Sequence, residues 1–383
     1  MDWHLDRLLK LPDMTVVKVQ EIEGLIFLSL ESLKEGIICP HCENYTEDVH
    51  QTREVLVRDL SICGRGVYLK VPRRQFICSE CGRYTTEELE GMVFKRHHTE
   101  RYEEYVYGRV VATTVKQVSR EEQLKEDEIQ AIFEAVSEEK NQKNWQPVKH
   151  IGLDEISTAK GQKKYRAVVS DLDKKCLIDV IASRTQEELI EVLSQQPKDI
   201  REKVEEVCID MWGGFVKVIE EVFPNAIIVY DRFHVMKMVN KRLNEIRCKL
   251  GMRAKGMRHL LLSNREDLTK EEKEELSRLL KDYPILQIAY EEKEELREIY
   301  ERTRTISGGT RKLRRWLKNA EVFYGEICET IRQHFEGICH YFINRTTNGA
   351  MEGLNNRSRV ILRQTYGLRN FQHLRSRLLA ANH

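Results

Sequence analysis

Three acidic residues in this sequence have the types and positions needed for metal chemistry, and two of them follow predicted strands. Asp154 stands in GLDE and Asp210 in CIDMW, each after a run of apolar and β-branched residues. If the two strands are neighbours in one sheet, both carboxylates project into one site, where their repulsion is tolerable only with a cation between them. Either Asp alone is more often a turn or strand-end residue, but the pair at matching positions favours a metal site.

The third acid, Glu352, is the only one in TTNGAMEGLNNRSRVILRQTYGLRNF, residues 346–371, where every other charged residue is arginine. A helix capped by Thr347 or Asn348 has polar and basic residues on the same face as Glu352: Asn355, Asn356, Arg359 and Arg363. The opposite face carries an apolar stripe: Met351, Leu354, Ile361 and Leu362. Glu352 either completes the metal site or only pairs with arginines of its own helix. The presence of the two aspartates favours the first role.

Four of the ten cysteines stand in two near-copies of one pattern, ICPHC and ICSEC: Cys39, Cys42, Cys78 and Cys81. Each C-x-x-C turn directs two thiolates at one ion, and two such turns complete a tetrahedral zinc site. Between them, REVLVRDL and GVYLKVPRRQFI alternate in polarity on either side of SICGRG, which predicts a β-hairpin. The sequence therefore predicts a zinc ribbon with one structural Zn²⁺. The alternatives are unliganded cysteine turns or a redox motif.

The net charge of +1, from 63 basic and 62 acidic residues, conceals a strong segregation along the chain. Residues 232–258 hold nine Lys or Arg and one acid, RTRTISGGTRKLRRWLKN holds seven and no acid, and residues 344–383 hold seven arginines and one acid. A solvated helix face would explain any one of these runs. Three of them in one half of the chain favour a surface that binds a polyanion.

The 383 residues, 41% hydrophobic and 33% charged, are typical of a globular protein, and no apolar run is long enough to cross a bilayer. We therefore expect a soluble, cytoplasmic protein. From residue 148, three predicted strands are followed by helix, strand, helix and strand, the order of an α/β domain of ribonuclease-H-like type. We expect three domains: residues 1–95 with the zinc ribbon, a helical domain at 96–145 and a catalytic domain at 146–383.

The helical domain shows apolar residues at helical spacing with a break near SREEQ, the outline of a helix-turn-helix. Its second helix carries four acids that a phosphate backbone would repel: Glu126, Asp127, Glu128 and Glu134. A purely structural helical pair is therefore the alternative to a helix that reads DNA.

Four longer motifs follow one another along the chain, behind the paired cysteines: GLDE, CIDMWGGF, YDRFHVMKMVN and TNGAMEGLNNRSRVILRQTYGLRNFQHLRSRLL. In this order they resemble bacterial transposases of the ISL-three insertion-sequence family, which are of the DDE type. The resemblance implies a catalytic triad of Asp154, Asp210 and Glu352 on a ribonuclease-H-like core. It also implies a mainly helical insertion at about residues 245–335, because the stretch between Asp210 and Glu352 is too long for the core alone.

The resemblance implies a transposase that binds transposon ends and catalyses metal-dependent DNA strand cleavage and strand transfer. Two Mg²⁺ or Mn²⁺ ions suit its oxygen-only site. The implied partner is double-stranded DNA, both the terminal repeats and the target, and no membrane is involved. The protein is expected to bind it as a homodimer or higher oligomer, in the bacterial cytoplasm and at the nucleoid when bound to DNA. Seven arginines are expected to hold DNA phosphates: Arg311, Arg314, Arg315, Arg357, Arg359, Arg363 and Arg369.

Three further residues are candidates for the site: His234, Asp231 and Asn356. Asp231 ends a predicted strand and is a reserve metal ligand. His234, in DRFH, either contacts the scissile phosphate or caps the start of a buried helix, and the second role is favoured. Two other functions stay open: a non-catalytic DNA-binding regulator derived from a transposase, and a structure-selective nuclease of the same fold that cuts without joining.

Overall fold

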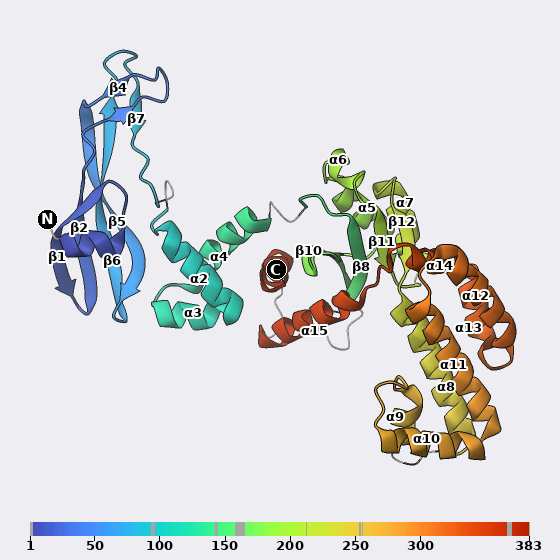
Figure 1. Ribbon diagram of the computed structural model, residues 1–383. Coiled ribbons are helices and arrows are strands. Elements are labelled where there is room, and N and C mark those ends of the chain that lie inside the picture. The colour runs from blue at the N-terminus through green and yellow to red at the C-terminus, as the bar shows by residue number, and fades with distance from the viewer. Residues whose placement is uncertain are drawn as a thin grey trace. The chain divides into compact units, whose positions relative to one another are not determined.

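The computed structural model describes residues 3–92, 96–141, 145–157, 165–211, 213–252, 254, 256–365 and 370–382. The chain forms two compact units, Met1–Lys140 and Asn141–His383, and each has its own sheet and helices (Figure 1). Among the described residues, no helix is both long enough and apolar enough to cross a lipid bilayer.

The first unit begins with α1 (Trp3–Leu9) and contains a five-stranded sheet of order β1-β2-β6-β5, with β7 paired to β6. Its strands are β1 (Met14–Ile22), β2 (Leu25–Ser32), β5 (Val49–Ile62), β6 (Arg65–Ile77) and β7 (Tyr84–Thr86). The predicted hairpin is confirmed: β5 and β6 pair antiparallel across Cys63 and Gly64, which both have positive φ. The hairpin of β1 and β2, which turns at Glu23 and Gly24, is an addition to what the sequence predicted.

Two very short strands, β3 (Ile37–Ile38) and β4 (Tyr45–Thr46), pair with each other and enclose the first cysteine turn. Three helices follow the sheet: α2 (Glu100–Ala112), α3 (Val115–Glu122) and α4 (Glu126–Asn141). Gln123 ends α3 in the left-handed conformation, in the region of the predicted break. The helices are joined to the sheet by a buried ion pair, in which Arg58 on β5 lies 3.4 Å from Glu122 on α3.

The sheet of the second unit has the strand order β10-β9-β8-β11-β12. Its strands are β8 (His150–Ser157), β9 (Tyr165–Asp171), β10 (Cys176–Ile181), β11 (Glu206–Ile209) and β12 (Ile227–Tyr230). The first three strands pair antiparallel, whereas β11 pairs parallel with both β8 and β12. Every residue of β11 is buried, and three of its four residues are apolar, the exception being Glu206 at its start.

Helices pack on this sheet and connect its strands. They are α5 (Gln186–Ser194), α6 (Lys198–Arg201), the 3₁₀ helix η1 (Gly213–Phe215), α7 (Val216–Val222), α14 (Phe335–Asn344), α15 (Gly349–Gln364) and α16 (Phe371–Ala381). α14 contacts β12, α15 contacts β8 and α16 contacts β10. The contact of α14 requires Gly337, because a Cβ there would lie 2.6 Å from the ring of Tyr230.

Between β12 and α14 the chain forms only helices in its described part: α8 (Arg232–Lys249), α9 (Met257–Leu262), α10 (Lys270–Asp282), α11 (Pro284–Arg302), α12 (Ile306–Asn319) and α13 (Glu321–Gln333). α8 and α11 run side by side away from the sheet, and α9 and α10 lie at their far end (Figure 1). Leu243 and Ile246 of α8 share a buried apolar cluster with Leu286 and Tyr290 of α11. The start of α8 therefore lies at the sheet edge, and its other end lies in a separate helical core.

Candidate active site and zinc centre

Three neighbouring parallel strands bring three aspartates to one edge of the second unit's sheet. The prediction that the first of these strands ends at Asp154 was wrong, because β8 continues to Ser157. β8 and β11 pair in parallel up to Gly152 and Cys208, and β12 pairs in parallel on the other side of β11. Asp210 and Asp231 directly follow β11 and β12, and Asp154 lies on β8 two residues beyond its last pair with β11. Residues at matching positions of parallel strands point to the same face. The register therefore sets Asp154 and Asp210 side by side.

Asp154 is partly buried and accepts hydrogen bonds on both carboxylate oxygens. The backbone N–H of Glu155 donates to Oδ1 at 2.7 Å, and Nδ2 of Asn355, on α15, donates to Oδ2 at 2.7 Å. Burial, together with the neighbouring charge of Asp210, raises the pKa of Asp154 above that of an ordinary Asp. The ionised pair is thus unfavourable by itself, and a divalent cation would stabilise it.

Asp231 is 1% exposed and its carboxylate is occupied by protein groups. Thr347 Oγ1 and the N–H of Asn348 donate to Oδ1 at 2.7 and 3.2 Å, and Oδ2 lies 3.3 Å from Nδ1 of His234. Burial acts to raise the pKa of Asp231, but the contacts with His234 and Thr347 outweigh it and lower the pKa. The contact with Asp231 in turn raises the pKa of His234, which stands in the first turn of α8. Asp231 thereby fixes both α8 and the segment before α15.

The segment between α14 and α15 follows β11 toward the aspartates. At the start of β11, the 1% exposed Glu206 accepts a hydrogen bond from the hydroxyl of Thr346. Two residues further along both segments, Nδ2 of Asn348 donates to the carbonyl oxygen of Cys208 at 3.3 Å. α15 then begins at the edge where Asp210 follows the strand. These contacts had no signal in the sequence beyond the polar residues of the TTN motif.

Gly152, the glycine of GLDE, makes room for this segment. A Cβ at Gly152 would lie 2.6 Å from Oδ1 of Asn348 and 2.6 Å from Oγ of Ser170, closer than side-chain atoms normally approach. Asn348 is the N-cap residue of α15, as one of the two predicted alternatives, Thr347 or Asn348, had it. Its side chain makes no capping hydrogen bond. The side chain is turned to the strands instead.

Glu352 lies in the first turn of α15 with an exposed side chain. The predicted apolar stripe is largely correct, because Met351, Leu354 and Ile361 are buried. The prediction that Asn355 shares the exposed face of Glu352 was wrong, since Asn355 is only 4% exposed and bonds to the strand that α15 covers. At 100° per residue, Asn355 lies between the two faces, and tertiary packing decides its side.

Within the described part of the chain, Glu352 forms no ion pair with Arg359 or Arg363. Nη1 of Arg359 donates instead to Oδ1 of Asn356 at 2.8 Å. Among the described residues, the carboxylates of Asp154, Asp210 and Glu352 do not form a set within 4.8 Å of one another. Two of the three acids are therefore neighbours by register, and the third stands on the helix that contacts β8.

The arginines expected to hold DNA lie on two helices. Arg357, Arg359 and Arg363 are exposed on α15, while Arg369 falls outside the described residues. Three more are exposed on α12: Arg311, Arg314 and Arg315. The buried residues of α12, among them Leu313 and Trp316, form the opposite stripe, so its basic face is exposed. Arg314 also lies over the ring of Phe335, 5.5 Å from its centroid.

The four predicted cysteines of the first unit converge on one point. The sulfur atoms of Cys39 and Cys81 are 3.7 Å apart, those of Cys42 and Cys78 are 3.5 Å apart, and all four lie within 4.8 Å of one another. Sulfurs bound tetrahedrally at ~2.3 Å from Zn²⁺ are about 3.8 Å apart, so the set fits one zinc ion.

The two cysteine turns repeat one hydrogen-bond pattern. The N–H of Glu43 donates to the carbonyl of Cys39 at 2.9 Å, and that of Gly82 to the carbonyl of Cys78 at 2.8 Å. Glu43 and Gly82 both have the left-handed conformation, with φ of 60° and 68°. The N–H of His41 lowers the pKa of the Cys39 thiol to about 7. The N–H of Asn44 acts to lower the pKa of the Cys42 thiol, but burial and the other three cysteines outweigh it and raise that pKa, so the four sulfurs oppose one another as thiolates and a cation would relieve this.

Comparison with known proteins identifies the family of the chain. A family model described as transposase matches residues 151–378, and a model described as the zinc-finger of transposase IS204/IS1001/IS1096/IS1165 matches residues 35–81. The chain is 26% identical over 368 residues to the transposase for insertion sequence element IS1001 of Bordetella parapertussis, covering 92% of this chain and 90% of that one. It is 25% identical over 264 residues to the transposase for IS1557 of Mycobacterium tuberculosis, covering 59% and 58%. The chain therefore belongs to the ISL-three family of insertion-sequence transposases.

Proposed function

We propose that this transposase cleaves and joins DNA strands at a metal site held by Asp154, Asp210 and Glu352. The observation that carries the proposal is the parallel register of β8 and β11, because it makes neighbours of two carboxylates that repel each other. The contact of α15 with β8 supports Glu352 as the third ligand.

The donor set fits Mg²⁺ or Mn²⁺, because it consists of carboxylate oxygens only. The raised pKa of Asp154 supports the same conclusion, since a cation would offset both its burial and the charge of Asp210. Ions bound there would supply Lewis-acid activation of water or a 3′-hydroxyl and charge stabilisation on the leaving oxygen.

The residues around the carboxylates have distinct tasks in this proposal. The hydrogen bond from Asn355 would keep Asp154 in one orientation when it holds an ion. The contacts of Thr346, Thr347 and Asn348 hold the start of α15, and with it Glu352, against the strand ends. The exposed arginines of α15 bind phosphates of the strand to be cut, which explains an isolated acid among arginines.

We further propose a ribonuclease-H-like core, supported by the strand order β10-β9-β8-β11-β12 with its three antiparallel and then parallel strands. α2 to α4 would form the helix-turn-helix-like domain, within the division of residues 1–95, 96–145 and 146–383. Glu128 on α4 accepts a hydrogen bond from Nε2 of His98 at 3.0 Å, so one of the acids that oppose DNA binding already has a partner within the protein. Assembly as a dimer or higher oligomer on DNA completes the proposal.

Labelled duplexes that carry the DNA flanking the gene, incubated with the purified chain and Mg²⁺, test the reaction. We expect cuts at the element's ends and, with target DNA present, joined products. Asp210→Asn should abolish both while the far-UV circular dichroism stays unchanged, and Glu191→Gln, an exposed acid on α5, should retain them. Cuts without joined products would indicate a nuclease, and binding without cuts a regulator.

A further inference from the structure

We infer that a cleft along α8 binds the single-stranded DNA that continues past the scissile phosphate. The inference rests on the proposed cleavage site, because the cleft begins beside it. The cleft has a volume of about 690 Å³, and its lining includes Phe233 at one end, Thr347 and Gly349 from the start of α15, and Arg258 at the other end. It therefore connects the sheet edge with the helical part of the second unit.

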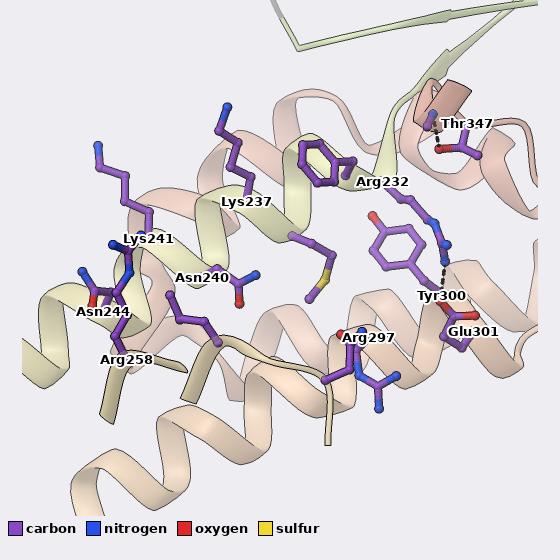
Figure 2. A pocket seen from close by; sticks show the side chains of 15 residues that line it. Arg232, Lys237, Asn240, Lys241, Asn244, Arg258, Arg297, Tyr300, Glu301 and Thr347 are labelled. Atoms are coloured by element: carbon purple, nitrogen blue, oxygen red, sulfur yellow. Dashed lines mark hydrogen bonds and ion pairs between the residues drawn. The ribbon is translucent and has the colours of Figure 1, made fainter. Parts of the chain in front are cut away.

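One face of α8 forms a wall of this cleft. Phe233, Lys237, Asn240, Lys241 and Asn244 recur at helical spacing and all line it. Lys237 and Lys241 line the outer rim of the cleft, and Figure 2 shows their side chains extending from α8 away from α11, with Asn240 between the two helices. An exposed aromatic ring followed by cations along one groove is the combination that binds unpaired bases and their phosphates, and Phe233 is 46% exposed.

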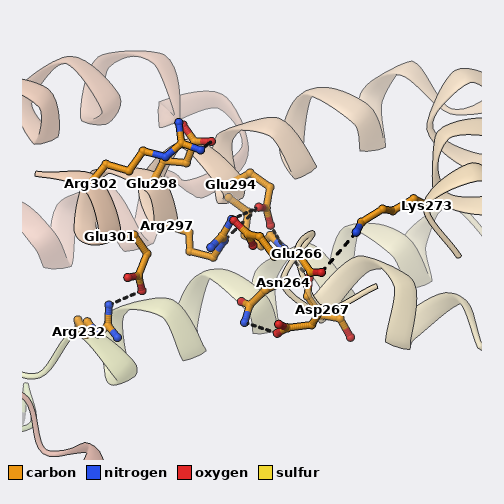
Figure 3. Close-up of polar contacts among 12 residues, drawn as sticks. Arg232, Asn264, Glu266, Asp267, Lys273, Glu294, Arg297, Glu298, Glu301 and Arg302 are labelled. Atoms are coloured by element: carbon orange, nitrogen blue, oxygen red, sulfur yellow. Dashed lines mark hydrogen bonds and ion pairs between the residues drawn. The ribbon is translucent and has the colours of Figure 1, made fainter. Parts of the chain in front are cut away.

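The cations of the cleft divide into paired and unpaired ones. Nη1 of Arg232 lies 2.6 Å from Glu301, and Arg297 lies 2.9 Å from both Glu266 and Glu294 (Figure 3). These pairs fix the α11 wall and leave little net charge there.

By contrast, Lys237, Lys241 and Arg258 are exposed and have no acidic partner within the described residues. The uncompensated positive charge of the cleft therefore lies on its rim, at the positions where a phosphate backbone would pass.

Two buried polar atoms in the cleft also lack partners within the described part of the chain. The hydroxyl of Tyr300, a residue only 1% exposed, makes no hydrogen bond, and neither does Oδ1 of Asn240. Both side chains lie between α8 and α11 (Figure 2). Burying such atoms without a hydrogen bond is costly, so they are suited to a polar ligand that supplies the missing hydrogen bonds. A nucleotide supplies both a phosphate acceptor for the hydroxyl and base or sugar donors for the amide oxygen.

The size of the cleft selects the form of the DNA. Its volume of about 690 Å³ falls in the ~300–1,000 Å³ range of small-ligand pockets, which suits one or two nucleotides of a single strand and excludes a duplex. The rim lysines stand one helical turn apart, about 6 Å along α8, so the strand would continue along the helix. The arginines of α15 would hold the duplex, and the cleft the unpaired strand.

The test measures the fluorescence anisotropy of labelled DNA titrated with the full chain in the absence of divalent metal. One probe is a blunt duplex of the element's end, and the other is the same duplex with a four-nucleotide dT overhang past the cut. We expect the overhang to strengthen binding. Lys237→Ala with Lys241→Ala should remove this gain and reduce the salt slope of overhang binding by roughly 0.7 per lost contact. Phe233→Ala should weaken overhang binding about 5- to 150-fold, as for lost base stacking.

Lys249→Ala is the matched control, because Lys249 is exposed on α8 but does not line the cleft. It should leave both affinities unchanged. Tyr300→Phe should weaken overhang binding without lowering Tm, whereas a hydroxyl with a structural role would lower Tm when removed. The inference is overturned if the overhang adds no affinity, or if the lysine variants weaken blunt and overhang probes equally. Failure of the proposed cleavage would leave the overhang effect measurable, so the two claims fail separately.

Discussion

Replacing Asp154 by asparagine should make the metal-free protein more stable and, at the same time, abolish its stabilisation by Mg²⁺. Burial and the charge of Asp210 raise the pKa of Asp154 in the folded state, despite its hydrogen bonds to Glu155 and Asn355. The acid therefore binds its proton more tightly folded than unfolded, so its contribution to stability falls as pH rises through the folded pKa. At pH 7 the ionised carboxylate costs stability, and an asparagine removes that charge at nearly the same volume. Its Oδ1 keeps the hydrogen bond from Glu155, and its NH2 group can donate to Oδ1 of Asn355, which has no partner in the wild type, once the Asn355 amide turns over.

The metal effect has a magnitude that follows from linkage. Mg²⁺ at 100 times its dissociation constant adds about 2.7 kcal/mol to a folded state that alone binds it. For a unit the size of Asn141–His383, this corresponds to roughly 5–11 °C in Tm. Asp154→Asn removes a ligand, and most of this shift should disappear.

Differential scanning calorimetry in EDTA and in Mg²⁺ measures both effects. Glu352→Gln separates the metal-free effect from the metal effect, because Glu352 is exposed. The stability of this variant without metal should stay within about 0.5 kcal/mol of the wild type. Its stabilisation by Mg²⁺ should nevertheless be lost. Glu191→Gln should keep both properties. A lower Tm of Asp154→Asn in EDTA, or a full Mg²⁺ shift in either active-site variant, would refute the reasoning.

Three further outcomes are expected. Purified protein should contain one zinc per chain by elemental analysis, and Cys39→Ser should lose it and unfold the ribbon; full zinc in that variant would contradict the site. Arg359→Ala with Arg363→Ala should barely change Tm but reduce the salt slope of end binding by roughly 0.9 per lost phosphate contact, and an unchanged slope with a clear loss of Tm would show a structural pair. Burial and the charge of Glu295 raise the pKa of Glu292 to about 7. The free energy of unfolding of the wild type should therefore fall between pH 4.5 and 7 relative to that of Glu292→Gln. The expected loss is on the order of 1 kcal/mol, because partial exposure of Glu292 reduces the effect. Urea unfolding of both proteins at pH 4.5 and 8 checks this, and equal differences at the two pH values would contradict it.

Features encoded by local spacing were readable from the sequence. The cysteine turns, the hairpin between them and the alternation of strands and helices in the second unit depend on neighbours a few residues apart. The apolar stripe of α15 is also local, because 100° per residue fixes which side chains share a face. The three acids were selected for the same reason, since each follows or begins a recognisable element.

Tertiary structure alone decided how those elements meet. Asn355 bonds to Asp154 across 201 residues of sequence, and Thr347 to Asp231 across 116. No local pattern encodes such contacts, because they depend on which strands become neighbours and on the position at which each helix packs along the sheet. The same holds for the cleft on α8: the sequence supplies its lysines and phenylalanine, but only the packing of α8 against α11 brings the unpartnered hydroxyl of Tyr300 to the same groove.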